Sequence, residues 1–176
     1  DKTFNKERVD YRVLGSVLVA AINARPHRTL GDIDILLDEK YFQKVKDCLV
    51  KEGYGFVKKR KLGFSWLEAC KPNSLGFTFL LIGSFYNNYF SYKYGIVELR
   101  ISEAYLTPVR YSLLGYDFTG IPLRSIYEGL KISGLNPKRK LDNNVIKRVF
   151  KGKIPKGNTL EDSFKVYIFG VEIPGL

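Results

Sequence analysis

The stretch that most restricts the possible folds of this chain lies between positions 14 and 37. A Gly15-Ser16 dipeptide opens an apolar run over residues 17–24, and a basic, turn-forming segment over residues 25–31 follows. The sequence then continues as Asp32-Ile33-Asp34 at the start of a second apolar run. This order predicts a short helix, a loop, and then a buried strand whose two acidic side chains need a counter-charge.

Asp32 and Asp34 are expected on the same face of that strand. Successive side chains of a strand point to opposite faces, so the two carboxylates project together while Ile33 and Ile35 face the core. Two adjacent carboxylates repel each other unless a cation lies between them. Mg²⁺, or Mn²⁺ in its place, is a hard divalent ion that prefers oxygen ligands. The spacing therefore predicts a metal-binding pair.

The Gly15-Ser16 dipeptide complements the acidic pair. Residues 11–14 resemble a short strand and residues 16–24 a helix, so Gly15 would form the turn between them and Ser16 would be the N-cap. A helix N-terminus carries unpaired N–H groups and a partial positive charge, which favour phosphate. A phosphate site followed by a carboxylate pair is what phosphoryl or nucleotidyl transfer from a metal–triphosphate requires.

The pattern from Gly15-Ser16 to Asp32-Ile33-Asp34 resembles the nucleotidyltransferase superfamily related to DNA polymerase beta. The run over residues 25–34 is most similar to small stand-alone members, of the aminoglycoside or lincosamide type and of the toxin-like type in abortive-infection systems. The resemblance implies an α/β (α+β) fold with a mixed, mostly antiparallel sheet flanked by helices. We expect a single domain over residues 1–176, with a core at about 11–135 and a C-terminal helix and tail at about 136–176.

The same resemblance implies a third carboxylate on a later neighbouring strand. Glu98, within the apolar run 94–101, is the residue that matches, and it would complete a metal site with Asp32 and Asp34. Members of the family more often have Asp at this position, and Glu is one methylene longer. Arg100 shares a face with Glu98, so a simple ion pair is the alternative. In the catalytic interpretation Glu98 takes the proton of the acceptor hydroxyl.

The resemblance also implies a set of phosphate-binding residues. Gly15 and Ser16 would hold the β- and γ-phosphates, and Arg28 would bind a phosphate oxygen or, without metal, neutralise the aspartates. Lys138 would line the far wall of the cleft, as would Lys131, Arg139 and Asp142. The alternative for each of these residues is a position on a solvated helix face.

The other expected elements follow from hydrophobic spacing and turn residues. Residues 38–52 form the clearest helix, with Asp38 as N-cap and Gly53 as its end. Further strands are expected at 55–58, 63–67, 76–82 and 94–101, a hairpin at 113–124, helices opened by a capping box at 125–128 and by Asn136-Pro137, and a late run at 164–169 that could add an edge strand.

The charge of the chain points to polyanionic partners. Its formal net charge is +11, which favours nucleic acid, nucleotides or acidic proteins and argues against an aminoglycoside-type substrate. The cluster at 58–61 is expected in a hairpin turn, where it would contact a polyanion or simply be solvated. The aromatic residues at 85–94 could stack on bases, although packing across strands is the favoured alternative.

Several classes of function are disfavoured. His27 is the only histidine, which argues against a histidine metal site or a Ser-His-Asp triad, and the spacing of Cys48 and Cys70 matches no zinc or redox motif. The sequence contains neither an apolar run long enough to span a bilayer nor a signal-peptide core at residues 1–10, so we expect no membrane association and a cytoplasmic location.

The sequence thus predicts an enzyme: a Mg²⁺- or Mn²⁺-dependent nucleotidyltransferase. It would transfer a nucleoside monophosphate from a nucleoside triphosphate to the hydroxyl of an unidentified acceptor. Two alternatives remain open. The chain could keep the fold without the chemistry and bind RNA, or it could bind a protein partner, as one half of a toxin–antitoxin pair does.

Overall fold

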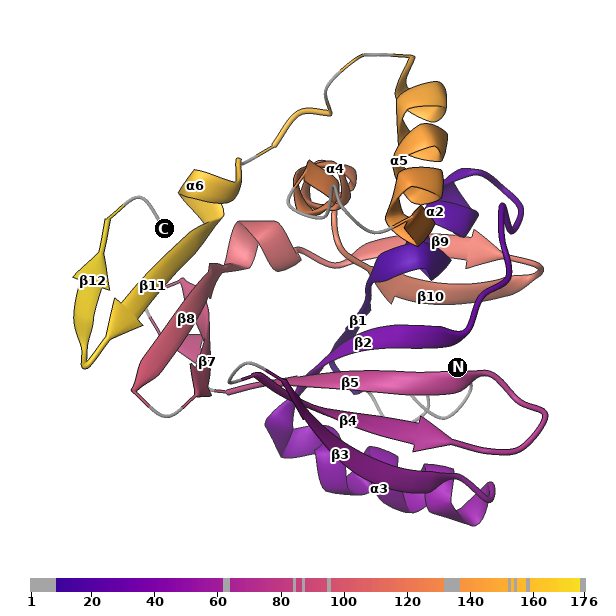
Figure 1. Ribbon diagram of the computed structural model, residues 1–176, viewed down its shortest axis with the longest axis horizontal. Helices are drawn as coiled ribbons and strands as arrows, with labels where there is room; N and C mark the ends of the chain where they lie inside the picture. Colours follow the sequence, from indigo (N-terminus) through magenta and orange to yellow (C-terminus); the bar gives the residue numbers. More distant parts are fainter. Residues whose placement is uncertain are drawn as a thin grey trace.

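The computed structural model describes residues 9–61, 64–83, 85–86, 88–94, 96–131, 137–151, 153, 155–157 and 159–174. These residues form an α+β structure with two sheets (Figure 1). The predicted fold class is confirmed, and the second sheet is an addition to it. No described helix is long and apolar enough to cross a membrane.

The first sheet has seven strands and carries the acidic pair. In spatial order they are β3 (Gly55–Lys61), β4 (Phe64–Cys70), β5 (Gly76–Ile82), β2 (Asp32–Asp38), β1 (Tyr11–Val13), β10 (Tyr116–Gly120) and β9 (Val109–Leu113). The pairs β2–β5 and β1–β10 are parallel and the other pairs are antiparallel. The sheet is therefore mixed and mostly antiparallel, as expected.

The second sheet has five antiparallel strands from the middle and the end of the chain. Their order is β12 (Val171–Ile173), β11 (Phe164–Ile168), β8 (Val97–Ser102), β7 (Tyr89–Tyr94) and β6 (Phe85–Tyr86). β11 was expected to be an edge strand, but it lies between β8 and β12. A turn at Gly170, with φ +80°, folds β12 back onto it.

The helices connect and cover these sheets. They are α2 (Gly15–Ile22), α3 (Phe42–Lys51), α4 (Leu123–Lys131), α5 (Pro137–Phe150) and α6 (Leu160–Ser163), with 3₁₀ turns η1 (Glu39–Tyr41) and η2 (Glu103–Leu106). Figure 1 shows α3 along β3 and β4, and α2 and α5 beside β9 and β10.

Both α2 and α3 cover the same face of the first sheet. Gly120, Val13, Ile35 and Phe79 are paired in one row across β10, β1, β2 and β5, so they share a face. A Cβ at Gly120 would lie 2.3 Å from Leu18 of α2, and the Phe79 ring packs 6.4 Å from that of Phe42 in α3. The fully buried Leu18, Ile35 and Phe79 therefore lie in the core under this face.

The opposite face of the same strands carries the acidic pair. Asp32 and Asp34 alternate with Ile33 and Ile35 along β2 and therefore project from the face opposite to the core residues under α2 and α3. Their row continues across β5 and β4 through Thr78 and Glu68. We call this part of β2, β5, β4 and β3 the open face, because its side chains are exposed or only half-buried.

Two local predictions were wrong, each because a long-range contact decided the outcome. The cluster at 58–61 lies within β3, since pairing with β4 extends the hairpin beyond it. The capping box does not open α4, which begins two residues earlier. The hydroxyl of Ser125 donates to the Tyr105 carbonyl of η2 instead, at 2.8 Å, and Glu128 pairs with Arg124.

Most other elements agree with the expected positions. β5 has the expected bounds, Asp38 accepts from the Lys40 N–H at the start of η1, and the helical segment ends before Gly53, with φ +86°. The aromatic stretch at 85–94 contributes β6 and β7, which pair in register at Phe85 and Phe90. The expected end of α4 near Gly134 lies outside the described residues.

Candidate active site

The start of β2 brings the two aspartates to the open face. Asp32 is exposed and Asp34 half-buried, and each is paired in register with a small residue of β5, Gly76 and Thr78 respectively. The Thr78 hydroxyl donates to Asp32 Oδ2 at 2.7 Å. The structure thus confirms that the two side chains share a face, and it adds a hydroxyl donor that the sequence pattern did not indicate.

Gly15 fits against Asp34 because it has no side chain. A Cβ at Gly15 would lie 2.3 Å from Asp34 Oδ2, and its backbone has φ +66°, a conformation that glycine adopts without strain. The Leu14 N–H donates to the Asp34 carbonyl oxygen at 2.8 Å. The first turn of α2 therefore lies directly beside the half-buried carboxylate.

Ser16 is not the N-cap of α2. The helix begins at Gly15, so Leu14 occupies the cap position without a side-chain hydrogen bond, and Ser16 lies in the first turn with 7% of its surface exposed. The helix N-terminus still lies next to Asp34, as the phosphate-site prediction requires.

The environment of Asp34 favours a bound cation. Burial, and after it the negative charge of Asp32, raises the pKa of Asp34 to about 6; the charges of Arg139 and Arg28 act in the opposite direction. A carboxyl whose charge is disfavoured in the free protein gains most from a divalent ion. Paired carboxylate oxygens suit Mg²⁺ or Mn²⁺, so the residues present fit the expected metal.

A buried ionic network connects the preceding loop to α5. Asp142 of α5 is 4% exposed, and Arg28 donates to both of its oxygens, from Nε at 2.9 Å and from an Nη at 3.2 Å. His27 Nε2 lies 2.6 Å from the same carboxylate. Both partners are mostly buried, with side-chain exposures of 17% for Arg28 and 6% for His27. The network therefore fixes the loop that leads into Asp32.

The charges of this network reach the aspartate pair. Burial acts to raise the pKa of Asp142, but the hydrogen bonds from Arg28 and His27 outweigh it and lower that pKa. The hydrogen bond to Asp142, and also the negative charges of Asp32 and Asp34, raise the pKa of Arg28. Arg28 thus carries a permanent charge near the pair, held in place by the carboxylate of Asp142.

The expected far wall of the cleft is partly described. Arg139 and Asp142 of α5 do lie near residues 27–34, through the charge of Arg139 on Asp34 and the contacts of Asp142. The side chains of Lys138 and Lys131 lie outside the described residues, so the phosphate role of Lys138 stays a prediction.

Glu98 does not join the pair. It lies in β8 of the second sheet, opposite Tyr167 and Lys93, and its carboxylate accepts from Arg100 Nε at 2.7 Å. The expectation that it stands on a strand next to Asp32 is therefore wrong, because β8 pairs with β7 and β11. Within the part of the chain that the structure describes, no three His, Cys, Asp or Glu side chains are grouped to hold a metal ion.

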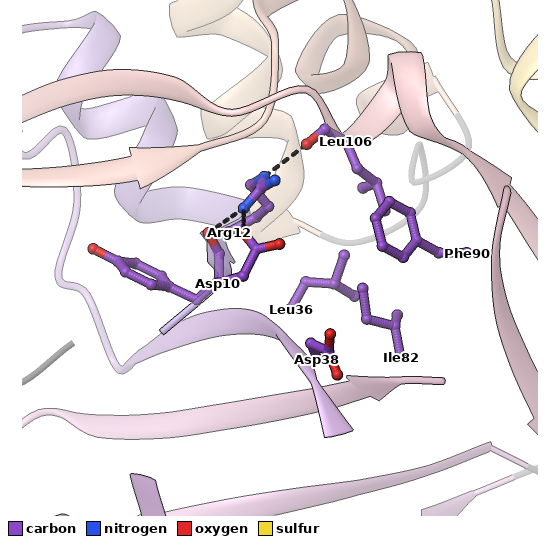
Figure 2. Close-up of a pocket in the computed structure, with 8 residues that line it drawn as sticks. Asp10, Arg12, Leu36, Asp38, Ile82, Phe90 and Leu106 are labelled. Atoms are coloured by element: carbon purple, nitrogen blue, oxygen red, sulfur yellow. Dashed lines mark hydrogen bonds and ion pairs between the residues drawn. The ribbon is translucent and has the colours of Figure 1, made fainter. Parts of the chain in front are cut away.

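A small pocket at the other end of β2 is distinct from this site (Figure 2). It lies between the two sheets, where Arg12 donates to the Leu106 carbonyl at 2.6 Å and pairs with Asp10. It is lined by Asp10, Tyr11, Arg12, Leu36, Asp38, Ile82, Phe90 and Leu106. Its contacts join the second sheet to the first, which is a structural role.

The fold of the chain is similar to that of several solved structures. No family model and no curated protein matches the sequence. The chain nevertheless has the nucleotidyltransferase fold. It is similar to the lincomycin-bound lincosamide antibiotic adenylyltransferase LnuA, with a TM-score of 0.66 at 18% identity over 83% of this chain and 90% of that one.

Two further structures have the same fold. ANT(2'')-Ia in complex with adenylyl-2''-tobramycin gives a TM-score of 0.59 at 9% identity, covering 83% of this chain and 82% of that chain. An antigenic nucleotidyltransferase-like protein from Paracoccidioides brasiliensis gives 0.51 at 13% identity, covering 88% and 73% respectively. At these identities the similarity is one of fold, in agreement with the resemblance of the Gly15-Ser16 and Asp32-Ile33-Asp34 pattern.

Sequence reasoning missed two features of the site. His27 and Arg28 share Asp142 as a partner, and the only available signal was a single acidic residue in a basic helix, far along the chain from a basic loop. Thr78 is paired with Asp34, and nothing in the strand 76–82 distinguishes it from an ordinary β-branched residue.

Proposed function

We propose that the chain is a metal-dependent nucleotidyltransferase that moves a nucleoside monophosphate from a nucleoside triphosphate to an acceptor hydroxyl. One observation carries the proposal: Asp34, half-buried and with its pKa raised to about 6, lies against both Asp32 and the N-terminal turn of α2. The proposed cation site and the proposed phosphate site would therefore be adjacent, in a chain that has the nucleotidyltransferase fold.

Asp32 and Asp34 would hold Mg²⁺ or Mn²⁺. When bound, the ion would polarise the phosphoryl group and stabilise charge on the leaving pyrophosphate. The Thr78 hydroxyl fixes Asp32 by donating to one of its oxygens, which leaves the other oxygen for the ion. Their shared face and their mutual repulsion are the features that support this assignment.

The triphosphate would bind between α2 and α5. The N–H groups at Gly15 and Ser16 supply donors at a helix N-terminus. Arg28, held by Asp142, supplies a fixed positive charge beside the aspartates, and Arg139 supplies a second one. Lys138 precedes Arg139 on the same helix, and we retain it as a candidate phosphate ligand.

A second candidate function follows from the residue that β5 pairs with Asp34. That residue is Thr78, which cannot serve as a carboxylate ligand or as a strong base. This pairing favours the alternative of a protein that binds a metal–nucleotide without transferring it. Pyrophosphate release in the presence of candidate acceptors separates transfer from binding alone.

Calorimetric titration of the four nucleoside triphosphates with Mg²⁺ or Mn²⁺ tests the proposal. We expect metal-dependent binding by the wild-type protein and none by the Asp32→Ala/Asp34→Ala double variant. A matched control is Glu98→Gln, which changes an acidic residue of the other sheet and should bind as the wild type does. The absence of binding by well-folded wild type with any triphosphate contradicts the proposal.

A further inference from the structure

The open face continues beyond the metal site toward the edge of the sheet. Glu68 of β4 is paired with Thr78, which is paired with Asp34, so all three lie on one face. Trp66 lies two residues from Glu68 on the same face, and Lys59 of β3 is paired with it. Trp66 and Lys59 therefore share the face of the aspartate pair and lie two residues along the strands from the row of Glu68, Thr78 and Asp34.

Trp66 is held in a fixed position while remaining accessible. Its indole Nε1 donates to Glu68 Oε1 at 2.9 Å, and the residue is only half-buried. Lys59 Nζ lies 3.9 Å from Glu68 Oε2, and 48% of its side chain is exposed. The only tryptophan of the chain thus offers a ring beside a cation. A flat aromatic ring next to positive charge can stack on a nucleobase while the cation binds phosphate.

The edge strand β3 adds a concentrated positive charge. Its residues 58–61 are all basic; Lys59 lies on the open face beside Trp66, whereas Lys58 and Arg60 alternate with it and lie on the opposite face of the same edge, and all three are exposed. Charged residues on an edge strand also prevent pairing with another chain, which accounts for the cations but not for a half-exposed tryptophan beside Lys59. The net charge of +11 favours a polyanion over a small cation as the partner of this surface.

The distance from the β3 edge to the aspartates suits a bound polymer that lies across the sheet. Three strand spacings of about 4.8 Å separate β3 from β2, roughly 14 Å across the sheet, and Lys59 and Trp66 lie a further ~7 Å along the strands from the row of Asp34. A polymer with phosphates at β3 and a base on Trp66 would end over β5 and β2, where Asp32 and Asp34 lie.

We infer that the β3–β4 edge binds the end of a single-stranded polynucleotide, which presents its terminal hydroxyl as the acceptor at the Asp32 and Asp34 site. This inference rests on the proposed function. The hydroxyl oxygen bonds to the α-phosphorus of the triphosphate, and the bond from that phosphorus to pyrophosphate breaks. Pyrophosphate leaves with the bonding electrons, and the hydroxyl proton passes to water.

The test uses fluorescein-labelled oligouridylate, the DNA oligomer of matching length, and a duplex RNA. We expect single strands to quench the emission of Trp66 and to raise the anisotropy of the label, with weaker binding of the duplex. The comparison of RNA with DNA shows whether the 2′-hydroxyl contributes. Trp66→Leu should weaken single-strand binding about tenfold, the loss expected for one stacked base.

A matched pair of variants separates local from general charge effects. Lys59→Gln removes an exposed charge from the open face, and Lys58→Gln removes an exposed charge from the opposite face of the same strand. We expect only Lys59→Gln to reduce the salt dependence of binding, by about 0.7 in slope for each phosphate that is no longer neutralised. Equal effects of both variants, or an unquenched Trp66 with bound oligomer, would overturn the inference.

Triphosphate calorimetry on the same preparations distinguishes this inference from the function on which it rests. Metal-dependent triphosphate binding with no single-strand binding overturns the inference and leaves the proposed function intact. Single-strand binding with Trp66 quenching but no triphosphate binding supports the surface and contradicts the proposed function. Quenching by tobramycin or lincomycin without single-strand binding would identify a small-molecule acceptor and overturn the inference.

Discussion

Replacing Asp34 with asparagine should stabilise the metal-free protein at neutral pH. In the folded chain, burial and the charge of Asp32 raise the pKa of Asp34 from 3.8 to about 6. The folded state therefore holds this proton more tightly than the unfolded state, and folding stability falls as the pH rises through that interval. Since one pKa unit corresponds to about 1.4 kcal/mol, the loss approaches roughly 3 kcal/mol above pH 6. An asparagine side chain carries no charge and would avoid this loss.

The measurement is urea unfolding in EDTA at two pH values. At pH 7.5 we expect Asp34→Asn to exceed the wild type by up to roughly 3 kcal/mol, or about 6–12 °C in Tm for a chain of this size. Near pH 4, where the wild-type carboxyl is protonated, the difference should nearly vanish. Mg²⁺ should stabilise the wild type at pH 7.5 and have little effect on the variant, because the ion relieves the same repulsion.

Asp38→Asn is the matched control, because Asp38 lies at the other end of the same strand. Its carboxylate accepts from the Lys40 N–H and pairs with Lys40 Nζ, so its charge is compensated. We expect no gain in stability from this change at either pH. The reasoning is refuted if Asp34→Asn is no more stable than wild type at pH 7.5, or if its gain is the same at both pH values.

Three further predictions concern Glu98, Asp142 and Gly15. Glu98→Gln should leave the Kd for a metal–triphosphate within about twofold of wild type, and a loss as large as that of the aspartate double variant would show that Glu98 reaches the site. Asp142→Asn should weaken triphosphate binding about tenfold and lower stability by about 2 kcal/mol in urea unfolding, because Arg28 loses a charged partner; an unchanged Kd would contradict a positioning role. Gly15→Ala should destabilise by more than about 1 kcal/mol, since its Cβ would meet Asp34 and its φ is +66°, and a thermal melt equal to wild type would disprove the close contact.

Elements whose pattern is local were predictable from the sequence. The aromatic and aliphatic run over 76–82 predicted β5 with its observed bounds, and Asp38 and Gly53 marked the ends of the helical segment that contains α3. Asp32 and Asp34 share a face because a strand repeats every two residues, whatever surrounds it. The Gly15 turn could likewise be recognised, although the helix starts at Gly15 itself.

Predictions that depended on distant contacts failed or fell short. Ser125 and Glu128 have the spacing of a capping box, but a carbonyl of η2 and the guanidinium of Arg124 bind them instead. The basic cluster at 58–61 resembles a turn until β4 is available to pair with it. The intrinsic preference of a residue for helix, strand or turn contributes less free energy than a complete set of strand hydrogen bonds and buried contacts.

Short stretches of the chain are enough to predict that two carboxylates share a strand face and follow a glycine turn at the start of a helix. Which groups surround these carboxylates depends on how distant parts of the chain pack together. Arg28 and Asp142 lie 114 positions apart yet form a double hydrogen bond. Glu98 lies in an apolar strand like that of Asp32, and only the pairing of β8 with β7 and β11 places it in another sheet. Strand pairing is decided by burial of whole faces across the molecule, a sum that no local pattern contains.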